Sequence, residues 1–253
     1  MIEALGPELA REVTWRAAEE PCLTGDLAAI FRETPNVHKW AHYLPVYESA
    51  LAGFRSRPVR MLEIGVFRGG SLQMWRRYLH LESIVVGIDI DTSTKQFDNP
   101  GQRIHVRIGD QTDTRFLQTV IDEFGPFDII LDDGSHMNSH IAQTFRYLFP
   151  HGLASAGIYI VEDIHANYWP KFRDDPMSFT DLTKWLIDSM HAHYFSATSG
   201  LRFQVGHPAR VREHRVPLAT TLIDKVEAYD SITVIHRARG SREVPASLPV
   251  KQK

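Results

Sequence analysis

Carboxylates and histidines follow two short apolar runs of the sequence. Residues 132–136 read DDGSH and residues 162–165 read EDIH. If both runs are strands of one parallel sheet, their carboxyl ends meet at one edge and bring four carboxylates together. Like charges at such short range need a cation, and carboxylate oxygens suit Mg²⁺. The spacing therefore predicts a magnesium site, against the alternative that these are separately solvated turn residues.

An earlier segment has the composition of a ligand-binding turn. Residues 63–71 read EIGVFRGGS, where glycines let the backbone turn tightly and approach a ligand. The residue two places after Gly65 is Phe67, which breaks the dinucleotide fingerprint G-x-G-x-x-G and argues against NAD or FAD. About twenty residues later, Asp89 can accept hydrogen bonds from the ribose hydroxyls of a nucleoside. The alternative to ribose binding is that Asp89 caps a helix or is a carboxylate on the surface.

A third polar segment, residues 109–113, reads GDQTD and follows another apolar run. Side chains there could contact the edge of an adenine ring. The competing interpretation is that Thr112 or Asp113 caps the next helix. Taken together, Glu63 in the first apolar run, the glycine turn that follows it and Asp89 at the end of the second run predict a nucleoside site.

A parallel sheet must position these segments, and the pattern from residue 59 onward predicts one. Short runs rich in Ile and Val alternate with helical stretches, as in βαβ units. The predicted strands are 60–66, 84–90, 104–108, 127–131 and 157–161. Helices are predicted over 114–124, where Gly125 and Pro126 follow, and over 139–149.

The flanking regions predict a helical cap and a small antiparallel element. Residues 1–56 form the cap, interrupted by a loop at 34–40, and residues 59–165 form the core. Residues 166–240 form a lid loop to 180, a helix over 180–194, and a hairpin with strands 202–205 and 231–237. Residues 241–253 are expected to be a disordered tail. With 253 residues, 43% of them apolar, we expect one domain over 1–240.

Composition excludes several classes of partner. A net charge of −3 argues against a surface built for nucleic acid or anionic lipid. Cys22 is the only cysteine, so an intrachain disulfide and a thiolate zinc cluster are excluded. Neither a leader peptide nor a membrane-spanning run is apparent, which predicts a soluble, cytoplasmic protein. Apolar surface on the terminal elements predicts a homo-oligomer.

The motifs together resemble those of the metal-dependent sugar O-methyltransferases of macrolide biosynthesis, with the related cephalosporin-hydroxylase-like family and the mycobacterial methylmannose polysaccharide methyltransferases. The resemblance covers roughly residues 34–165 and rests on 63–71, 87–89, 131–136 and 161–163. It implies a Rossmann-like class I methyltransferase fold, an α/β structure with a mostly parallel sheet. It also implies S-adenosylmethionine and Mg²⁺ as cofactors, and as acceptor a hydroxyl of a sugar, an oligosaccharide or a glycosylated natural product.

The resemblance also assigns site residues. The metal would be held by Asp133, Glu162 and Asp163, and His136 would be the catalytic base. The S-adenosylmethionine site would comprise Glu63, Gly65, Ser71, Asp89, Asp110 and Gln111, and the loop from Lys39 to Tyr43 would help to close over it, with Tyr43 as a further contact.

The expected chemistry is an in-line displacement in which the acceptor hydroxyl loses its proton. A metal orients that hydroxyl and lowers its pKa, and His136 takes the proton. A loop histidine that caps the next helix is the competing role for His136. Three other functions stay open: methylation of a phenol or catechol, iron-dependent hydroxylation, and a non-catalytic helper that binds S-adenosylmethionine without turnover. Iron sites usually contain two histidines and one carboxylate, which disfavours hydroxylation.

Overall fold

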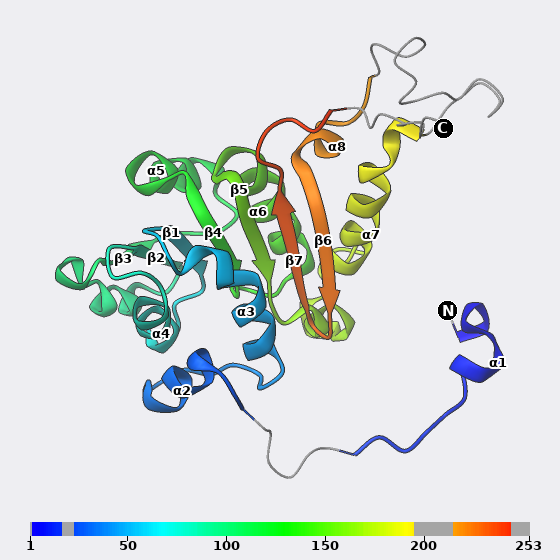
Figure 1. Ribbon diagram of the computed structural model, residues 1–253, viewed down its shortest axis with the longest axis horizontal. Coiled ribbons are helices and arrows are strands. Elements are labelled where there is room, and N and C mark those ends of the chain that lie inside the picture. Colours follow the sequence, from blue (N-terminus) through cyan, green and yellow to red (C-terminus); the bar gives the residue numbers. More distant parts are fainter. Residues whose placement is uncertain (1, 17–22, 195–214, 244–253) are drawn as a thin grey trace, which may run out of the picture.

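The computed structural model of the protein describes residues 2–16, 23–194 and 215–243. Its centre is a seven-stranded sheet with the order β3-β2-β1-β4-β5-β7-β6 (Figure 1). The first five strands along the chain pair in parallel, whereas β7 runs antiparallel to β5 and β6. The strands are β1 Arg60–Ile64, β2 Ile84–Asp89, β3 Ile104–Ile108, β4 Phe127–Asp132, β5 Leu153–Val161, β6 Ile223–Tyr229 and β7 Ile232–Arg237. The predicted α/β class with a C-terminal antiparallel pair is confirmed.

Successive side chains of each strand point to opposite faces of the sheet, which divides the core into two layers. Met61 of β1 packs into one layer with residues such as Trp75, while its neighbour Leu62 packs into the other with Phe145. Helices α2 Asp26–Glu33, α3 Tyr43–Leu51 and α4 Gly70–Tyr78 contribute to the first layer. Helices α5 Thr114–Phe124, α6 Asn138–His151 and α7 Phe179–Met190 contribute to the second. Both faces of the sheet are therefore covered, as a parallel sheet requires.

Side-chain caps set where several helices begin. The Asp113 carboxylate accepts a hydrogen bond from the Arg115 backbone N–H at 2.9 Å. Asp113 therefore caps α5, which was the competing interpretation of residues 112–113. Ser178 and Asp181 form a reciprocal capping box at the start of α7. The remaining helical elements are η1 Ile2–Leu5, α1 Gly6–Leu9, η2 Ala52–Phe54, η3 Thr92–Phe97, η4 Pro100–Gln102, η5 Ile164–Tyr168, η6 Pro170–Phe172, η7 Ala192–Tyr194 and α8 Leu218–Leu222.

The predicted N-terminal cap is only partly helical. Helices α2 and α3 flank the expected loop, but residues 11–16 are not helical, and there the prediction is wrong. In that stretch Val13 is 73% exposed and Trp15 is 90% exposed, so no apolar face is buried to stabilise a helix.

The C-terminal hairpin differs from the prediction in its first strand. β7 matches the predicted 231–237, but its hairpin partner is β6, residues 223–229. The proposed strand 202–205 and residues 244–253 of the expected tail lie outside the described residues. β6 lies at the sheet edge and exposes Asp224 and Lys225, which hides its strand character from an apolar pattern. Across the described residues, no helix has both the length and the apolar character needed to span a membrane.

Candidate functional site

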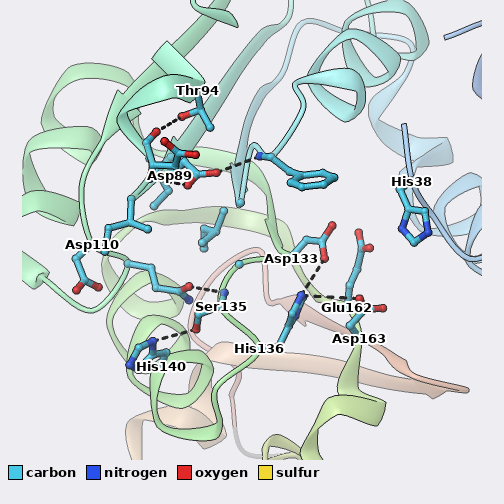
Figure 2. A pocket seen from close by; sticks show the side chains of 18 of the residues that line it. His38, Asp89, Thr94, Asp110, Asp133, Ser135, His136, His140, Glu162 and Asp163 are labelled. Atoms are coloured by element: carbon cyan, nitrogen blue, oxygen red, sulfur yellow. Dashed lines mark hydrogen bonds and ion pairs between the residues drawn. The ribbon is translucent and has the colours of Figure 1, made fainter. Parts of the chain in front are cut away.

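A cavity of about 500 Å³ lies at the carboxyl ends of the parallel strands (Figure 2). Its wall consists of the turns that follow β1, β2, β3, β4 and β5, together with residues 38–40 from the loop before α3. This volume falls within the range of small-molecule and cofactor sites. Five separate strand ends thus contribute polar groups to one space.

The turn after β1 is shaped by a glycine and a carboxylate. Gly65 has φ +92°, and a Cβ at this position would lie 2.2 Å from the Asp133 carbonyl oxygen, so only glycine lets the two turns approach. Asp89 Oδ2 accepts hydrogen bonds from the N–H groups of Val66 at 2.8 Å and Phe67 at 3.0 Å. Its Oδ1 accepts one from Asp91 N–H at 2.9 Å. Asp89 therefore fixes the turn and still has acceptor capacity on the cavity wall.

Two predicted residues after β3 also line the cavity, but they differ in how many hydrogen bonds they can still make to a ligand. Asp110 Oδ1 accepts from the backbone and the hydroxyl of Thr112, both at 2.8 Å, which lowers the pKa of Asp110 and keeps it charged. Gln111 uses both ends of its amide: Oε1 accepts from Ser135 N–H at 2.8 Å and Nε2 donates to Thr144 Oγ1 at 3.1 Å. Gln111 thus positions the turn after β4.

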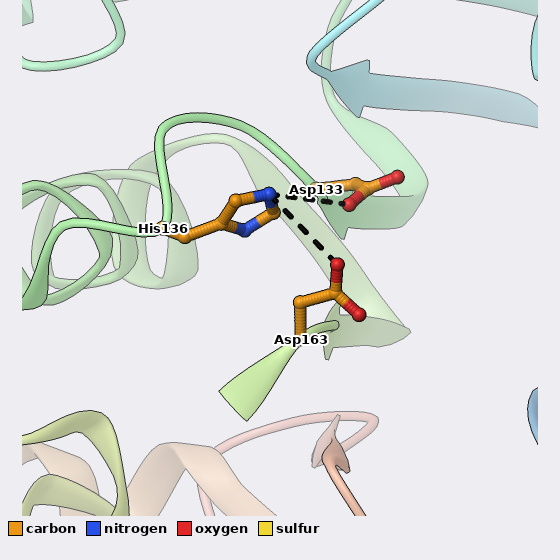
Figure 3. Close-up of side chains that lie close together, drawn as sticks. All are labelled: Asp133, His136 and Asp163. Carbon is orange, nitrogen blue, oxygen red and sulfur yellow. Dashed lines mark ion pairs between the residues drawn. The ribbon is translucent and has the colours of Figure 1, made fainter. Parts of the chain in front are cut away.

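Three side chains converge where β4 and β5 end (Figure 3). His136 Nε2 lies 3.9 Å from Asp133 Oδ1 and 3.9 Å from Asp163 Oδ2. The donor atoms of the three residues all lie within 4.8 Å of one another. His136 and Asp163 both have left-handed backbones, with φ +59° and +52°, a strain that folded proteins retain mainly at functional sites. The Asp133 and Asp163 carboxylates could hold a divalent cation, with the His136 imidazole beside it.

Lys39, from the loop before α3, supplies a cation that sequence reasoning missed. Its Nζ lies 2.6 Å from Asp133 Oδ2 and within 3.0 Å of both Glu162 oxygens. Burial alone would lower the pKa of the Lys39 ammonium, but the charges of Asp133, Glu162 and Glu63 raise that pKa well above its usual value. The inference that the carboxylates need a metal for neutrality is therefore corrected, since the chain supplies one compensating charge itself.

The fourth predicted carboxylate of the cluster, Asp132, points away from it. Asp132 is fully buried, accepts a hydrogen bond from Tyr159 Oη at 3.3 Å, and lies near Gly134 N–H at 3.3 Å. Burial raises the pKa of Asp132 to about 7. Because successive residues of a strand face opposite sides, Asp132 and Asp133 cannot both join one cluster.

Three residues predicted to contact S-adenosylmethionine lie behind the wall. Glu63 accepts hydrogen bonds from Ser71 Oγ at 2.9 Å and Trp75 Nε1 at 3.3 Å, and burial raises the pKa of Glu63 to about 7. The buried Tyr43 hydroxyl donates to Asp163 Oδ1 at 2.9 Å and lies 2.8 Å from Ser231 Oγ. Glu63, Ser71 and Tyr43 do not line the cavity, whereas Gly65, Asp89, Asp110, Gln111, Asp133, His136, Glu162 and Asp163 do.

Known proteins resemble this chain in sequence, although no protein-family model matches it. The 8-demethyl-8-alpha-L-rhamnosyl tetracenomycin-C 2'-O-methyltransferase of Streptomyces olivaceus is 32% identical over 227 residues, which are 76% of this chain and 59% of that protein. Demethylmacrocin O-methyltransferase of Streptomyces fradiae is 35% identical over 178 residues, 64% of this chain and 44% of that protein. Over these segments this chain is similar in sequence to O-methyltransferases. It spans about half the length of the curated relatives that it matches.

Solved structures of a methyltransferase share the fold. The MycE methyltransferase of the mycinamycin biosynthetic pathway, in complex with Mg and SAH, superposes with a TM-score of 0.71 and 29% identity, over 85% of this chain and 55% of that one. Its complex with Mg, SAH and mycinamycin VI gives a TM-score of 0.70 at 29% identity, over 85% of this chain and 54% of that one. The predicted class I methyltransferase fold is therefore confirmed.

Proposed function

We propose that this protein is an S-adenosylmethionine- and Mg²⁺-dependent O-methyltransferase that acts on a hydroxyl of a sugar, an oligosaccharide or a glycosylated natural product. The observation that carries the proposal is the meeting, in one cavity, of the Gly65 turn with Asp133, His136 and Asp163. The sequence similarity to a rhamnosyl tetracenomycin-C 2'-O-methyltransferase supports it, as does the presence of Mg, SAH and mycinamycin VI in the MycE complexes.

The cofactor half of the cavity fits a nucleoside. Gly65 allows a ligand to approach the backbone, while Asp89 and Asp110 offer unused acceptor capacity for hydroxyl and amine groups. S-adenosylmethionine bound in this half would supply an activated methyl group. Gln111 contributes by holding the adjoining turn, and Glu63, Ser71 and Tyr43 support the site from behind the wall.

The metal half is formed by the turns after β4 and β5. Asp133, Glu162 and Asp163 would hold Mg²⁺, which prefers such oxygen ligands, and the bound ion would orient an acceptor hydroxyl and acidify it. Glu162 is available to a metal only by giving up part of its contact with Lys39, because both of its oxygens lie within 3.0 Å of that ammonium.

His136 is the proposed general base. The acceptor oxygen forms its bond to the methyl carbon as the carbon–sulfur bond breaks, so its proton must go to a group within reach. His136 lines the cavity, and its Nε2 lies 3.9 Å from both Asp133 and Asp163, so the imidazole is within reach of a hydroxyl held at these carboxylates. General-base catalysis by such a residue contributes about 10²–10⁴-fold.

Calorimetric titration with S-adenosylhomocysteine, with Mg²⁺ and after EDTA, tests the proposal together with methyl transfer to a panel of glycosides and phenols. We expect cofactor binding and Mg²⁺-dependent methylation of a glycoside. Methylation of phenols but of no glycoside would instead indicate an O-methyltransferase of phenols or catechols. Binding without turnover on any acceptor would favour a non-catalytic helper, and absence of binding would refute the proposal.

Three predictions made from the sequence complete the proposal. We expect residues 1–240 to act as one domain, in the cytoplasm, and as a homo-oligomer. Light scattering on the purified protein measures the oligomeric state, and a monomer at micromolar concentration would contradict that part.

A further inference from the structure

A continuous row of ring contacts connects the cavity wall with the proposed base. Trp40, which lines the cavity, meets His165 edge-on at 5.7 Å between ring centroids. His165 lies 4.7 Å from Trp169, Trp169 lies 6.1 Å from Phe172, and Phe172 lies 5.9 Å from His136. We call Trp40, His165, Trp169 and Phe172 the aromatic row. It begins and ends at the site where the acceptor hydroxyl must lie.

The row is held in place from behind. His165 Nδ1 lies 2.5 Å from Ser231 Oγ, which fixes the ring against the β6–β7 turn. Trp169 ends η5 through a 2.9 Å hydrogen bond from its N–H to the Ala166 carbonyl, and Pro170 then starts η6, which carries Phe172 toward His136. The rings are thus preorganised, which reduces the entropy lost when a ligand stacks on them.

Both tryptophans of the row leave half of their surface in water, at 50% exposure each. A single exposed aromatic needs no explanation, but contiguous half-exposed rings beside a polar cavity offer an apolar binding surface. Lys171 Nζ lies 5.2 Å from the Phe172 centroid and covers part of that ring. The two tryptophans are therefore the free stacking surface.

We propose that the aromatic row binds the acceptor through the C–H face of an uncharged sugar residue and presents one of its hydroxyls to His136. This inference rests on the proposed function and specifies its acceptor class. Aromatic faces complement an apolar sugar face. An anionic sugar is disfavoured because the charges of Lys39 and of a bound Mg²⁺ are already balanced by Asp133, Glu162 and Asp163, which leaves no positive charge to pair with a sugar carboxylate.

The test measures binding of two probes to the 253-residue chain, with S-adenosylhomocysteine and Mg²⁺ present, by saturation-transfer NMR titration. Methyl α-L-rhamnopyranoside is the neutral probe and methyl β-D-glucuronide the anionic one. We expect the wild type to bind the rhamnoside at least tenfold more tightly than the glucuronide. Trp169→Ala should weaken rhamnoside binding about tenfold, since one stacked ring contributes on that order.

Matched variants separate a binding role from a structural one. Trp169→Phe keeps a ring and should recover most of the affinity, whereas Tyr168→Ala, at an adjacent side chain that is 64% exposed, should leave it unchanged. S-adenosylhomocysteine affinity should stay at the wild-type value in all three. Any of three results would overturn this inference and leave the proposed function standing. The first is unchanged rhamnoside binding by Trp169→Ala, and the second is equally tight binding of the glucuronide by the wild type. The third is a wild type that binds S-adenosylhomocysteine but not the rhamnoside. Failure to bind S-adenosylhomocysteine would overturn the proposed function and this inference with it.

Discussion

Replacement of Lys39 by methionine should make the stability of the protein depend on a divalent cation. The substitution keeps most of the side-chain volume but removes an ammonium that is 2% exposed and contacts Asp133 and Glu162. Removing one partner of a buried ion pair typically costs about 3–5 kcal/mol, because the other charge is left uncompensated. For a domain of this size, that loss corresponds to a fall in Tm of roughly 6–20 °C.

The loss should also vary with pH. Burial already raises the pKa of Glu63 to about 7 and that of Glu162 well above its usual value, and loss of the ammonium raises both further. A carboxylate whose folded pKa exceeds its unfolded pKa binds more protons when folded, so stability falls as pH rises. The full deficit of Lys39→Met is therefore expected near pH 8, and a smaller one near pH 6.

Thermal unfolding in EDTA and in 10 mM Mg²⁺ measures the effect. We expect Mg²⁺ to restore at least half of the Tm lost by the variant, and to change the wild type less. Lys184→Met is the matched control, because Lys184 is 61% exposed and its 3.0 Å pair with Asp181 is worth about 0–1 kcal/mol. A Lys39→Met protein with the wild-type Tm at pH 8 in EDTA would refute the charge argument, and a deficit insensitive to Mg²⁺ would refute the metal site.

Three further changes have defined outcomes. His136→Ala should leave S-adenosylhomocysteine affinity intact and slow methyl transfer at least 100-fold; normal turnover would remove His136 from the reaction. Gly65→Ala should cost about 3 kcal/mol in chemical unfolding, because its Cβ would lie 2.2 Å from the Asp133 carbonyl oxygen, whereas Gly53→Ala, where a Cβ meets nothing within 4 Å, should cost little. Burial opposes ionisation of Glu227, but hydrogen bonds from neighbours on β6 and β7 lower its pKa to about 2. Its stabilisation is present above its unfolded pKa near 4.3 and is lost toward pH 2, so Glu227→Gln should flatten the acid limb of the stability curve; an unchanged limb would contradict this.

Much of the fold could be predicted because its signals are local. Strand β3 and helix α5 have the predicted bounds, since buried parallel strands and one-sided helices each leave an apolar period in the sequence. Strand β6 left no such period, because an edge strand with exposed charges resembles a loop. The candidate site followed from the rule that ligands bind at the carboxyl ends of parallel strands, which requires only the strand positions.

The parts of the site that were missed depend on contacts between distant residues. Lys39 lies 94 residues before Asp133 and 123 before Glu162, and a lone lysine in a polar loop carries no mark of such a contact. Similarly, DDGSH places two aspartates side by side in sequence, and only the end of β4 decides which of them faces the cavity. The hydrogen bond from Tyr43 to Asp163 likewise joins residues 120 positions apart, and no local pattern indicates it.

The bonds of Tyr43 have a consequence for the order in which the molecule folds. Tyr43 contacts Asp163 across 120 residues and Ser231 across 188, so the support of Asp163 joins the helix before the sheet to the last β-turn. Contacts of such high sequence separation form late, after the loops between them have closed. The cluster of Asp133, His136 and Asp163 is thus expected to reach its final geometry only when β7 has paired with β5. A folding intermediate without that strand pair would contain most of the sheet but lack the Tyr43 and Ser231 contacts that support Asp163.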